Sequence, residues 1–471
     1  MNWKQFNRAN NLLGWAVFVI PTLTYLLTIG LSASLWDCAE FIACDYKLEI
    51  GHPPGAPFYM LVYNVISHLG GSPEHAAVLT NATSAVLSGL TILFLFWTIT
   101  HMVRRVLSPK AHLGEQGLDP VGEVMTRGQA VAILGSGLVG SLVYTFSDSF
   151  WFSAVEAEVY AFSSLFTAVV FWLIFKWEER SKYERSDRWL ILIAYLMGLS
   201  IGVHLLNLLC LPAMALVYYF RRAKTPTLKG SVLSLVASFA LVGLMMYGVV
   251  QGVPKLAGKW DMFFVNSLGL SYNQGVYIYL AVLVAVLIWG VYETELALKD
   301  EKHLRSHRFR ISIVLSLVLM GLPLIGDGIV AFLIAGAIGS FFYWYKGFTA
   351  RAVHTVQMCL VAIAMGFSSY GVILVRAVAD PPMNENAPAD AFSLRYYLAR
   401  EQYGSAPLFY GPTFASEYKI GSDGRPVFKD KEPTYGRIHK DKPSDPDKYV
   451  VRAKEDEPEY ESSGMMLFPR V

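Results

Sequence analysis

Charged side chains are scarce in this sequence. Asp, Glu, Lys and Arg make up 16% of its 471 residues, whereas 54% are hydrophobic. A soluble globular chain carries about 25% charged residues, so this composition argues against a soluble protein. The formal net charge is only +2, and no basic stretch with interleaved aromatic residues is present. We therefore expect no nucleic-acid partner.

Cysteine is rare as well. The four cysteines are Cys38, Cys44, Cys210 and Cys359, and no two form a CxxC pair. Cys38 and Cys44 are six positions apart, which on a helix directs their side chains away from each other. Neither a disulfide nor a cysteine metal site is expected.

Long apolar runs are abundant instead. They predict membrane-spanning helices, because unpaired backbone groups are too costly in lipid. The run from Leu12 is too long for a signal peptide and lacks a small-residue cleavage site, so it is expected to remain as the first span. The predicted fold class is all-α, a polytopic helical bundle with eleven spans near residues 12–34, 81–102, 129–147, 159–176, 189–204, 206–220, 230–252, 275–294, 310–325, 328–345 and 354–376.

Positive charges mark one set of span ends, from Lys4 and Arg8 through the run 299–310 to Lys346 and Arg351. The opposite ends carry the acidic segment 31–58, the segments 147–158 and 253–275, and everything after Arg376. The positive-inside rule then predicts a cytoplasmic N-terminus. The C-terminus and the candidate chemistry are expected on the extracytoplasmic side of the cytoplasmic membrane.

The last part of the chain differs in composition. Residues 1–377 are expected to form the transmembrane domain, whereas residues 378–471 are rich in Pro, Asp, Lys, Glu and Tyr and hold no run able to cross a bilayer. This extracytoplasmic region is long enough for a small domain or for docking on the external loops. Its abrupt end predicts that relatives are longer.

The segment 31–58 concentrates polar chemistry directly after the first span. Its ionisable side chains are Asp37, Glu40, Asp45, Glu49 and His52. If residues 35–45 are helical, Asp37 and Glu40 lie on one face and project together. Such carboxylates suit a general base or a cation ligand. The prolines and glycines of GHPPGAP predict a fixed position for His52. The alternative is that these acids are merely solvated.

Two further segments add candidate site residues. Glu156 and Glu158 precede the fourth span; two positions apart on a helix, only one of them would face a site shared with Asp37. The alternative is an aromatic belt with solvated acids. Arg376 lies at the external end of the last span, at the level of lipid phosphates. The alternative is that the Arg376 side chain only snorkels, placing its charge at the membrane surface without binding a ligand.

His204 and Asn207 lie in apolar surroundings, where an interhelical hydrogen bond is the expected role. External acids together with an arginine at headgroup level suit a lipid-phosphate substrate whose polar head reacts outside the membrane. The arginine would bind the phosphate by charge-assisted hydrogen bonds. A carboxylate would take a proton from the incoming acceptor.

Four segments carry a family resemblance: SLWDCAEFIACDYKLEIGHPPGAPFY, FWFSAVEAEVYAFSSLF, IGVHLLNLL and ADPPMNENAP. They resemble the bacterial family of uncharacterised domain 2723, also called glycosyltransferase family 117. That family is similar to the protein O-mannosyltransferases of the GT-C superfamily. The resemblance extends from the first span to about residue 390.

The resemblance implies a GT-C-type fold and transfer of a sugar, expected to be mannose, from a polyprenyl-phosphate donor to Ser or Thr hydroxyls of exported proteins. It assigns Asp37 as the essential acid of the first external loop and Glu40 as its support or the residue that orients the acceptor. Glu156 or Glu158 would be the acid of the second external loop, Arg376 the donor-phosphate ligand, and His52 a contact for the leaving phosphate or the sugar.

Transfer is expected to invert the anomeric centre in one displacement. No cofactor or metal is expected, because Arg376 can neutralise the phosphate, although the acids could hold an ion. Two alternatives stay open: a transporter or lipid flippase with His204 inside the bundle, and a non-catalytic subunit of an envelope complex that has kept the fold. An enzyme should show one external pocket lined by Asp37 and Arg376, whereas a transporter needs access to both sides.

Overall fold

The computed structural model describes residues 2–469 except 108–111, 114–119, 122–124, 184, 326–327, 405–406, 408, 430–432, 443 and 454–456. The protein is mostly helical, as predicted. Its α-helices are α1 Trp3–Leu26, α2 Cys38–Lys47, α3 Pro57–Ser67, α4 Ala76–Leu107, α5 Arg127–Thr145, α6 Asp148–Ala154, α7 Val159–Arg180, α8 Arg188–Ile201, α9 Leu211–Arg222, α10 Leu228–Gly243, α11 Gly252–Leu268, α12 Gln274–Lys299, α13 His307–Leu319, α14 Gly328–Trp344, α15 Ala350–Phe367, α16 Gly371–Val378 and α17 Ala391–Leu398.

Short helices join several of these elements. Those of 3-10 type are η1 His68–Gly70, η2 Pro73–His75, η3 Leu205–Cys210, η5 Glu301–Arg305, η6 Leu322–Ile325, η7 Ser368–Tyr370, η8 Glu401–Tyr403 and η9 Ser462–Gly464. The π-helix η4 Leu244–Val250 connects α10 to α11. Helix starts follow local chemistry: Asn2 with Gln5, and Thr126 with Gln129, form capping boxes at α1 and α5.

Seven segments of the described chain are long and apolar enough to cross a membrane: Trp3–Leu26, Pro73–Leu107, Arg127–Thr145, Val159–Arg180, Leu228–Leu268, Gln274–Lys299 and Ala350–Val378. Two shorter apolar helices are Arg188–Ile201 and Gly328–Trp344. The membrane character is confirmed, whereas the number of eleven crossings stays a prediction. Segment 253–275, which was predicted to be external, holds most of α11, and the π-helix η4 joins α11 to α10. The external position of this segment stays a prediction.

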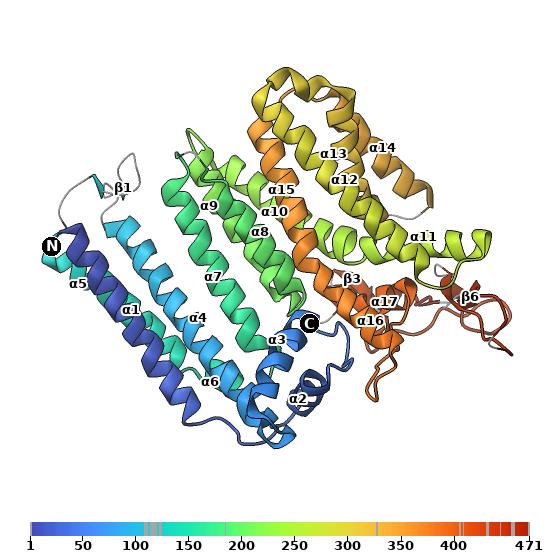
Figure 1. Ribbon diagram of the computed structural model, residues 1–471, viewed down its shortest axis with the longest axis horizontal. Coiled ribbons are helices and arrows are strands. Elements are labelled where there is room, and N and C mark those ends of the chain that lie inside the picture. The colour runs from blue at the N-terminus through green and yellow to red at the C-terminus, as the bar shows by residue number, and fades with distance from the viewer. Residues whose placement is uncertain are drawn as a thin grey trace.

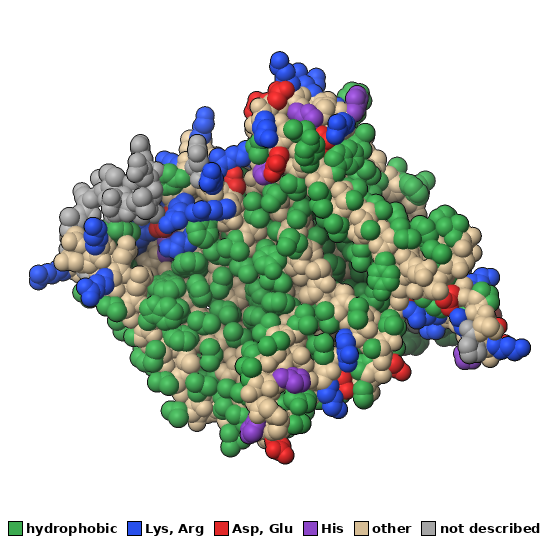
Figure 2. Space-filling model, in the orientation of Figure 1, with side chains coloured by type: hydrophobic (Ala, Val, Ile, Leu, Met, Phe, Trp, Pro, Cys, Tyr) green, Lys and Arg blue, Asp and Glu red, His purple; other side chains and the backbone are tan. Residues whose placement is uncertain are grey.

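Helices α1, α4 and α7 lie side by side in that order, and α5 packs against α1 and α4 (Figure 1). Further along, α8 packs on α15, and α12 packs on α13 and α15. Gly198 and Gly366 permit the close contact of α8 and α15, since a Cβ at either would collide with the backbone of the other helix. Hydrophobic side chains cover the middle of the visible face, and charged ones gather toward its rim (Figure 2).

Asn207 holds three elements together, as predicted. Its buried amide donates to Ser200 Oγ at 2.9 Å, and its oxygen accepts from Thr167 of α7 at 3.2 Å. His204 differs from the prediction, because its Nδ1 accepts from Leu206 N at 3.1 Å and caps η3. The interhelical hydrogen bond therefore belongs to Asn207.

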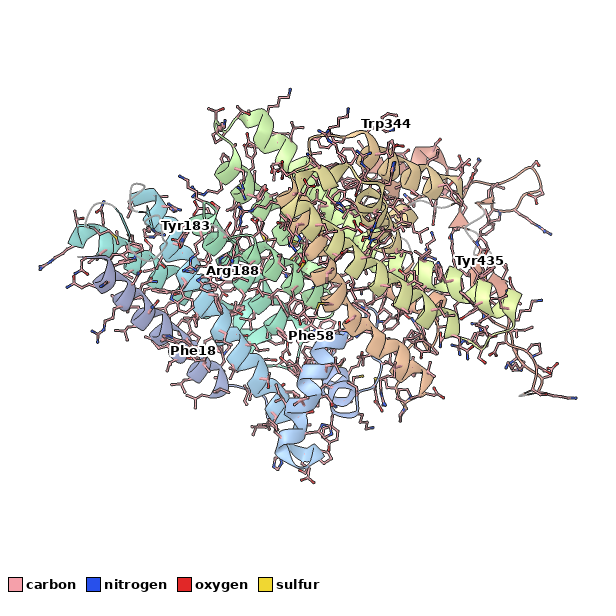
Figure 3. The ribbon with its side chains drawn as sticks, turned by 45° about the horizontal axis from the view of Figure 1, so that its top comes forward. Phe18, Phe58, Tyr183, Arg188, Trp344 and Tyr435 are labelled. Carbon is pink, nitrogen blue, oxygen red and sulfur yellow. The ribbon has the colours of Figure 1, made fainter. Side chains whose placement is uncertain are left out.

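Segment 31–58 and helix α3 form a small layer of their own. Figure 1 shows α2 and α3 at the end of the bundle opposite the N-terminus. Phe58 of α3 packs on Phe162 and Phe166 of α7 (Figure 3). The 31–58 segment is therefore fixed to the transmembrane helices through an aromatic interface.

The C-terminal region docks on α11 through α17 and short antiparallel strands. The pairs are β3 Tyr410–Pro412 with β8 Met465–Leu467, β4 Phe428–Lys429 with β7 Glu457–Pro458, and β5 Thr434–Arg437 with β6 Tyr449–Ala453; β1 His112–Leu113 and β2 Pro120–Val121 pair separately. In the β5–β6 pair, Tyr435 lies opposite Val451.

Asp261 of α11 anchors this docking. Its fully buried carboxylate accepts from Asn273 N and Gly275 N at 2.9 Å each, and from Tyr449 Oη at 2.7 Å. Burial of a carboxylate is tolerated when its oxygens are satisfied in this way.

Candidate functional site

The helix expected over residues 35–45 is present as α2. Asp37 precedes its first residue and makes no capping hydrogen bond, and Glu40 lies in the first turn. The Asp37 side chain is 52% exposed, whereas Glu40 is 21% exposed. Asp37 is thus the accessible carboxylate of the pair.

Glu40 and His52 form a tight pair. Glu40 Oε1 accepts from His52 N at 2.6 Å and lies 2.9 Å from His52 Nδ1. Gly51 permits this approach, since a Cβ there would collide with Glu40 Oε1. His52 Nε2 lies 3.9 Å from Asp37 Oδ2, so the imidazole stands between the two carboxylates.

The contact between Glu40 and His52 shifts the pKa of both side chains. The hydrogen bond to Glu40 raises the pKa of His52 despite partial burial. Burial by itself would raise the pKa of Glu40, but the hydrogen bonds from His52 outweigh it and hold that pKa below its ordinary value. The arrangement therefore favours a charged imidazolium next to Asp37.

Residues from the C-terminal part of the chain contact the loop that carries His52. Tyr397 of α17 donates its hydroxyl to Gly51 O at 2.5 Å. Ile50 pairs with Asn384 in a parallel bridge, and Glu385 N donates to Ile50 O at 3.1 Å. These contacts connect the GHPPGAP segment to ADPPMNENAP, about 330 residues later in the sequence.

Glu156 and Glu158 lie in the turn between α6 and α7, and both are 7% exposed. Glu156 accepts from Ser34 Oγ at 2.5 Å, and Glu158 accepts from Val159 N at 2.9 Å. The helical spacing assumed for these two residues does not apply, because both lie in a turn. Glu156 contacts Ser34 of segment 31–58, and Asp37 lies close enough to Glu158 to affect its pKa. Burial, followed by the neighbouring Asp37 and Glu156 carboxylates, raises the pKa of Glu158 to about 7.

Two further residues near Asp37 were not predicted to belong to the site. Burial raises the pKa of Glu385, and the Glu40 and Asp37 carboxylates raise it further, which places Glu385 beside them. Arg400, at the start of η8, lies within electrostatic reach of Tyr160 and His204. Glu385 lies in a motif that the sequence singled out, whereas an exposed arginine in the tail gives no sequence signal. We call Asp37, Glu40, His52, Glu156, Glu158 and Glu385 the Asp37 cluster.

Arg376 does not contact the Asp37 cluster; it binds the other end of α2. Its Nε donates to Leu48 O at 2.7 Å and its Nη2 to Lys47 O at 3.3 Å. These carbonyls terminate α2, and Asp37 precedes the other end of this ten-residue helix, about 15 Å away along its axis. In this structure Arg376 caps α2.

In the part of the chain that the structure describes, Asp45 and Glu49 form no hydrogen bond or ion pair with Asp37, Glu40 or His52. Asp45 is fully buried. Burial raises the pKa of Asp45 to about 8, and it outweighs the hydrogen bond with Ser67, which lowers that pKa. Glu49 is 5% exposed and lies 3.8 Å from Lys47 Nζ.

A cation could be held by Asp37, Glu40 and His52. Each offers one ligand atom, and these atoms lie within 4.8 Å of one another. Two carboxylates and an imidazole suit a divalent ion. Binding would require loss of the proton from His52 and rearrangement of its bond to Glu40.

Glu158→Gln gives a prediction on stability. A carboxyl whose folded-state pKa exceeds its ordinary value of 4.5 contributes stability that is complete below pH 4.5 and is lost as pH rises through about 7. Wild type should lose on the order of 2 kcal/mol relative to Glu158→Gln between pH 5 and pH 8.5. Thermal unfolding of both proteins at each pH measures this. The exposed Glu74→Gln is the control, and parallel curves for wild type and Glu158→Gln would contradict the buried titration.

Comparison with known proteins finds similarity in both parts of the chain. Residues 37–227 match the family model described as Protein O-mannosyl-transferase TMEM260 N-terminal domain. This match begins at Asp37 and includes Glu40, His52, Glu156 and Glu158. Residues 404–471 match a family of unknown function (DUF8416).

Two curated relatives are similar to part of this chain. The Protein O-mannosyl-transferase tmem260 of Dictyostelium discoideum is 23% identical over 253 residues, which cover 51% of this chain and 27% of the relative. The Protein O-mannosyl-transferase TMEM260 of Mus musculus is 24% identical over 189 residues, which cover 40% of this chain and 22% of the relative. The matches span about a quarter of each relative's length. No solved structure matches this chain.

Proposed function

We propose, from the similarity of residues 37–227 to the protein O-mannosyl-transferases, that this chain is a membrane glycosyltransferase acting on proteins. It transfers a sugar, mannose by analogy with the relatives' names, from a polyprenyl-phosphate donor to Ser or Thr hydroxyls of exported proteins. The kinship to uncharacterised domain family 2723, the GT-C-type fold and a bacterial cytoplasmic membrane belong to the same proposal.

The observation that carries this proposal is the state of Asp37. None of the described residues donates a hydrogen bond to its half-exposed carboxylate, whereas the neighbouring Glu40 is committed to His52. A carboxylate with open lone pairs beside a cation can accept a proton from a hydroxyl. Among these acids, we therefore propose Asp37 as the one that acts on an incoming acceptor.

The proposed reaction is a single displacement. Asp37 takes the proton of the Ser or Thr hydroxyl, whose oxygen forms a bond to the anomeric carbon. The bond from that carbon to the phosphate oxygen breaks, and its electron pair leaves with the lipid phosphate. Attack and departure on opposite faces invert the anomeric centre.

The His52 imidazolium is proposed to stabilise the charge on the departing phosphate. Glu40 fixes the ring and sustains its charge through the bond to Nδ1, which leaves Nε2 facing Asp37 and the open side. Arg400 is a second candidate for the phosphate, since it lies near Tyr160 at the start of α7. Glu158 and Glu156 are proposed to bind hydroxyls of the sugar, and partial protonation lets Glu158 also donate a hydrogen bond.

We further propose that the N-terminus faces the cytoplasm. The Asp37 cluster would then lie outside, because it occupies the end of α1, α4 and α7 opposite the N-terminus (Figure 1). Lys and Arg at the other end, including Arg104, Arg105, Lys176 and Arg180, support this orientation by the positive-inside rule.

Arg376→Ala separates two roles for this residue. If Arg376 binds the donor phosphate, the donor KM rises. The observed bonds to Lys47 O and Leu48 O instead predict that its loss loosens α2, lowers kcat about tenfold and leaves the donor KM unchanged. Steady-state kinetics of wild type, Arg376→Ala and Arg376→Lys with varied donor measure this. A raised KM with unchanged kcat would restore the direct phosphate role.

The proposed function is tested with purified protein in detergent or nanodiscs. It is incubated with polyprenyl-phosphate mannose and a Ser/Thr acceptor peptide, and mass spectrometry detects mannosylated peptide. Parallel reactions contain polyprenyl-phosphate glucose, an Ala-substituted peptide, or EDTA to detect a metal requirement. Sugar transfer from neither donor, with or without added divalent metal, would contradict the proposal.

A further inference from the structure

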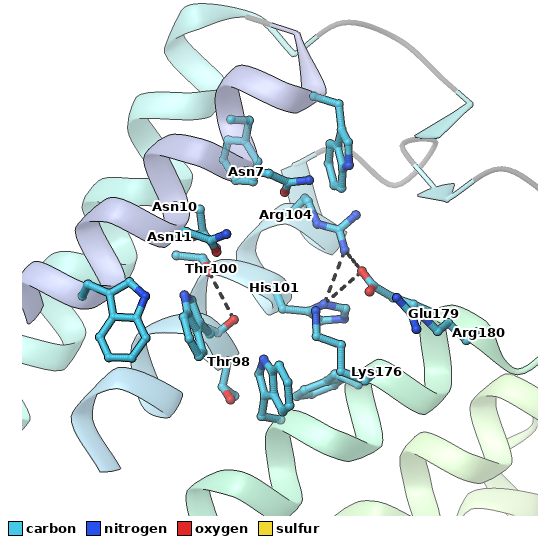
Figure 4. Close-up of a pocket in the computed structure, with 16 residues that line it drawn as sticks. Asn7, Asn10, Asn11, Thr98, Thr100, His101, Arg104, Lys176, Glu179 and Arg180 are labelled. Carbon is cyan, nitrogen blue, oxygen red and sulfur yellow. Dashed lines mark hydrogen bonds and ion pairs between the residues drawn. The ribbon is translucent and has the colours of Figure 1, made fainter. Parts of the chain in front are cut away.

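A second site lies at the other end of the same helices. A cavity of about 510 Å³ is lined by residues of α1, α4 and α7 (Figure 4). The Asp37 cluster touches the first residue of α7 through Glu158, whereas Lys176 and Arg180 of the cavity lie in its last two turns, about 30 Å away along the helix. The cavity is thus separate from the proposed active site.

One wall of the cavity is an amide face of α1. Asn7, Asn10 and Asn11 are spaced three and four apart, and Figure 4 shows them on the side of α1 that faces α4 and α7. Buried Asn10 Oδ1 has no hydrogen-bond partner among the described residues. Amides are costly on a helix that crosses a membrane, so three on one face need a polar occupant or water.

The opposite wall is cationic. Arg104 of α4 is paired with Glu179, which also contacts His101 Nδ1 at 3.3 Å. Across the described residues, no carboxylate forms an ion pair with Lys176 or Arg180, and the buried Arg180 Nε has no hydrogen-bond partner. Within the described residues, Lys176 and Arg180 are therefore two cations without a carboxylate partner, in contrast to Arg104, which is paired with Glu179.

Indole rings form the remaining walls. Trp3, Trp15, Trp97 and Trp172 all line the cavity, and Lys176 Nζ lies 5.1 Å from the centre of the Trp172 ring. Trp15 is 51% exposed next to the exposed Leu12, so one wall adjoins the apolar outer surface of α1. Tryptophan beside Lys and Arg at a helix end is the composition of the membrane headgroup level. On the visible face, Lys and Arg gather near the ends of α4 and α7 (Figure 2).

We propose that this cavity binds the phosphate group of an anionic membrane lipid, on the face of the membrane opposite the Asp37 cluster. Lys176 and Arg180 supply the counter-charge, the amides of Asn7, Asn10 and Asn11 donate to phosphate or glycerol oxygens, and the indole rings contact the first part of the chains. The inference needs only the membrane-spanning arrangement, so it stands or falls independently of the proposed glycosyl transfer.

Native mass spectrometry of the full chain in detergent tests this site with dioleoyl phosphatidylglycerol and dioleoyl phosphatidylcholine as probes. Wild type should bind phosphatidylglycerol at least tenfold more tightly, because only this lipid carries a net negative charge. The double variant Lys176→Gln/Arg180→Gln should lose about 30-fold in that affinity, and Arg180→Gln alone about fivefold. The matched control Lys182→Gln/Arg185→Gln removes two cations from the same end of the molecule and should bind as wild type does.

Equal affinity of wild type for the two lipids would overturn the proposal without reference to any variant. Equal losses in the cavity variants and in the control would also overturn it, since general surface charge would then explain the binding. Free sn-glycerol 3-phosphate distinguishes the source of the phosphate. We expect it not to displace phosphatidylglycerol at equal concentration; displacement would overturn the lipid assignment in favour of a soluble phosphate compound.

Discussion

Asp37→Asn is expected to lower sugar transfer to an acceptor peptide by about 10²–10⁴-fold, with the acceptor and donor KM values changed little. Asn keeps the size and the hydrogen-bonding shape of Asp but cannot accept the proton of the attacking hydroxyl. Because the Asp37 side chain is half exposed and caps no helix, the substitution should leave folding unchanged. Initial rates with varied donor and acceptor measure the effect.

Asp148→Asn is the matched control for this variant. Asp148 is an exposed acid in the first turn of α6, at the same end of the molecule, and it lies outside the Asp37 cluster. It should transfer sugar at the wild-type rate. An Asp37→Asn protein with wild-type kcat would remove Asp37 from the mechanism, and equal losses in both variants would point to a general effect of surface charge.

His52→Gln is expected to lower kcat by about 100-fold, since it removes a cation placed to stabilise the departing phosphate. Glu40→Gln should have a similar effect, because the charge and orientation of the imidazole depend on Glu40. The two residues act as one unit. The double variant should therefore be no worse than either single variant, a strongly non-additive result.

Kinetics of the two single variants and the double variant measure this coupling. Multiplicative losses would show that Glu40 and His52 act separately and would contradict the proposed division of roles. The pH profile gives an independent readout: loss of the Glu40 partner should shift the limb that reports His52 to lower pH, because the hydrogen bond that raises its pKa is gone.

The local structure of segment 31–58 could be predicted because its signals are local. Helix α2, the proximity of Asp37 to Glu40 and the fixed position of His52 follow from residue spacing and from the glycines and prolines of GHPPGAP. The membrane helices follow from apolar runs for the same reason. Local patterns determined these features, so a single sequence was sufficient.

Contacts between residues far apart in the sequence could not be predicted from local patterns. Arg376 has the right chemistry and depth for a phosphate ligand, but tertiary packing directs it to the carbonyl end of α2. Glu385 reaches the cluster through the pairing of Ile50 with Asn384, which no periodicity encodes. Glu156 and Glu158 were misjudged because helical spacing was assumed where the chain makes a turn.

The cavity at the N-terminal end had a sequence signal that was missed. Asn7, Asn10 and Asn11 repeat at helical spacing directly before an apolar run, and Lys176 and Arg180 are four apart at the end of another. Each set alone reads as a solvated helix end. Only the packing of α1 against α4, and of α4 against α7, turns them into facing walls.

The most direct measurement of the central claim is a cryo-electron microscopy structure with a non-transferable polyprenyl-phosphate sugar analogue. The account predicts that the sugar lies against Asp37 and Glu158, and that the phosphate lies beside Nε2 of His52. A headgroup bound at Arg376, or in the cavity between α1, α4 and α7, with the Asp37 cluster left without ligand, would contradict it.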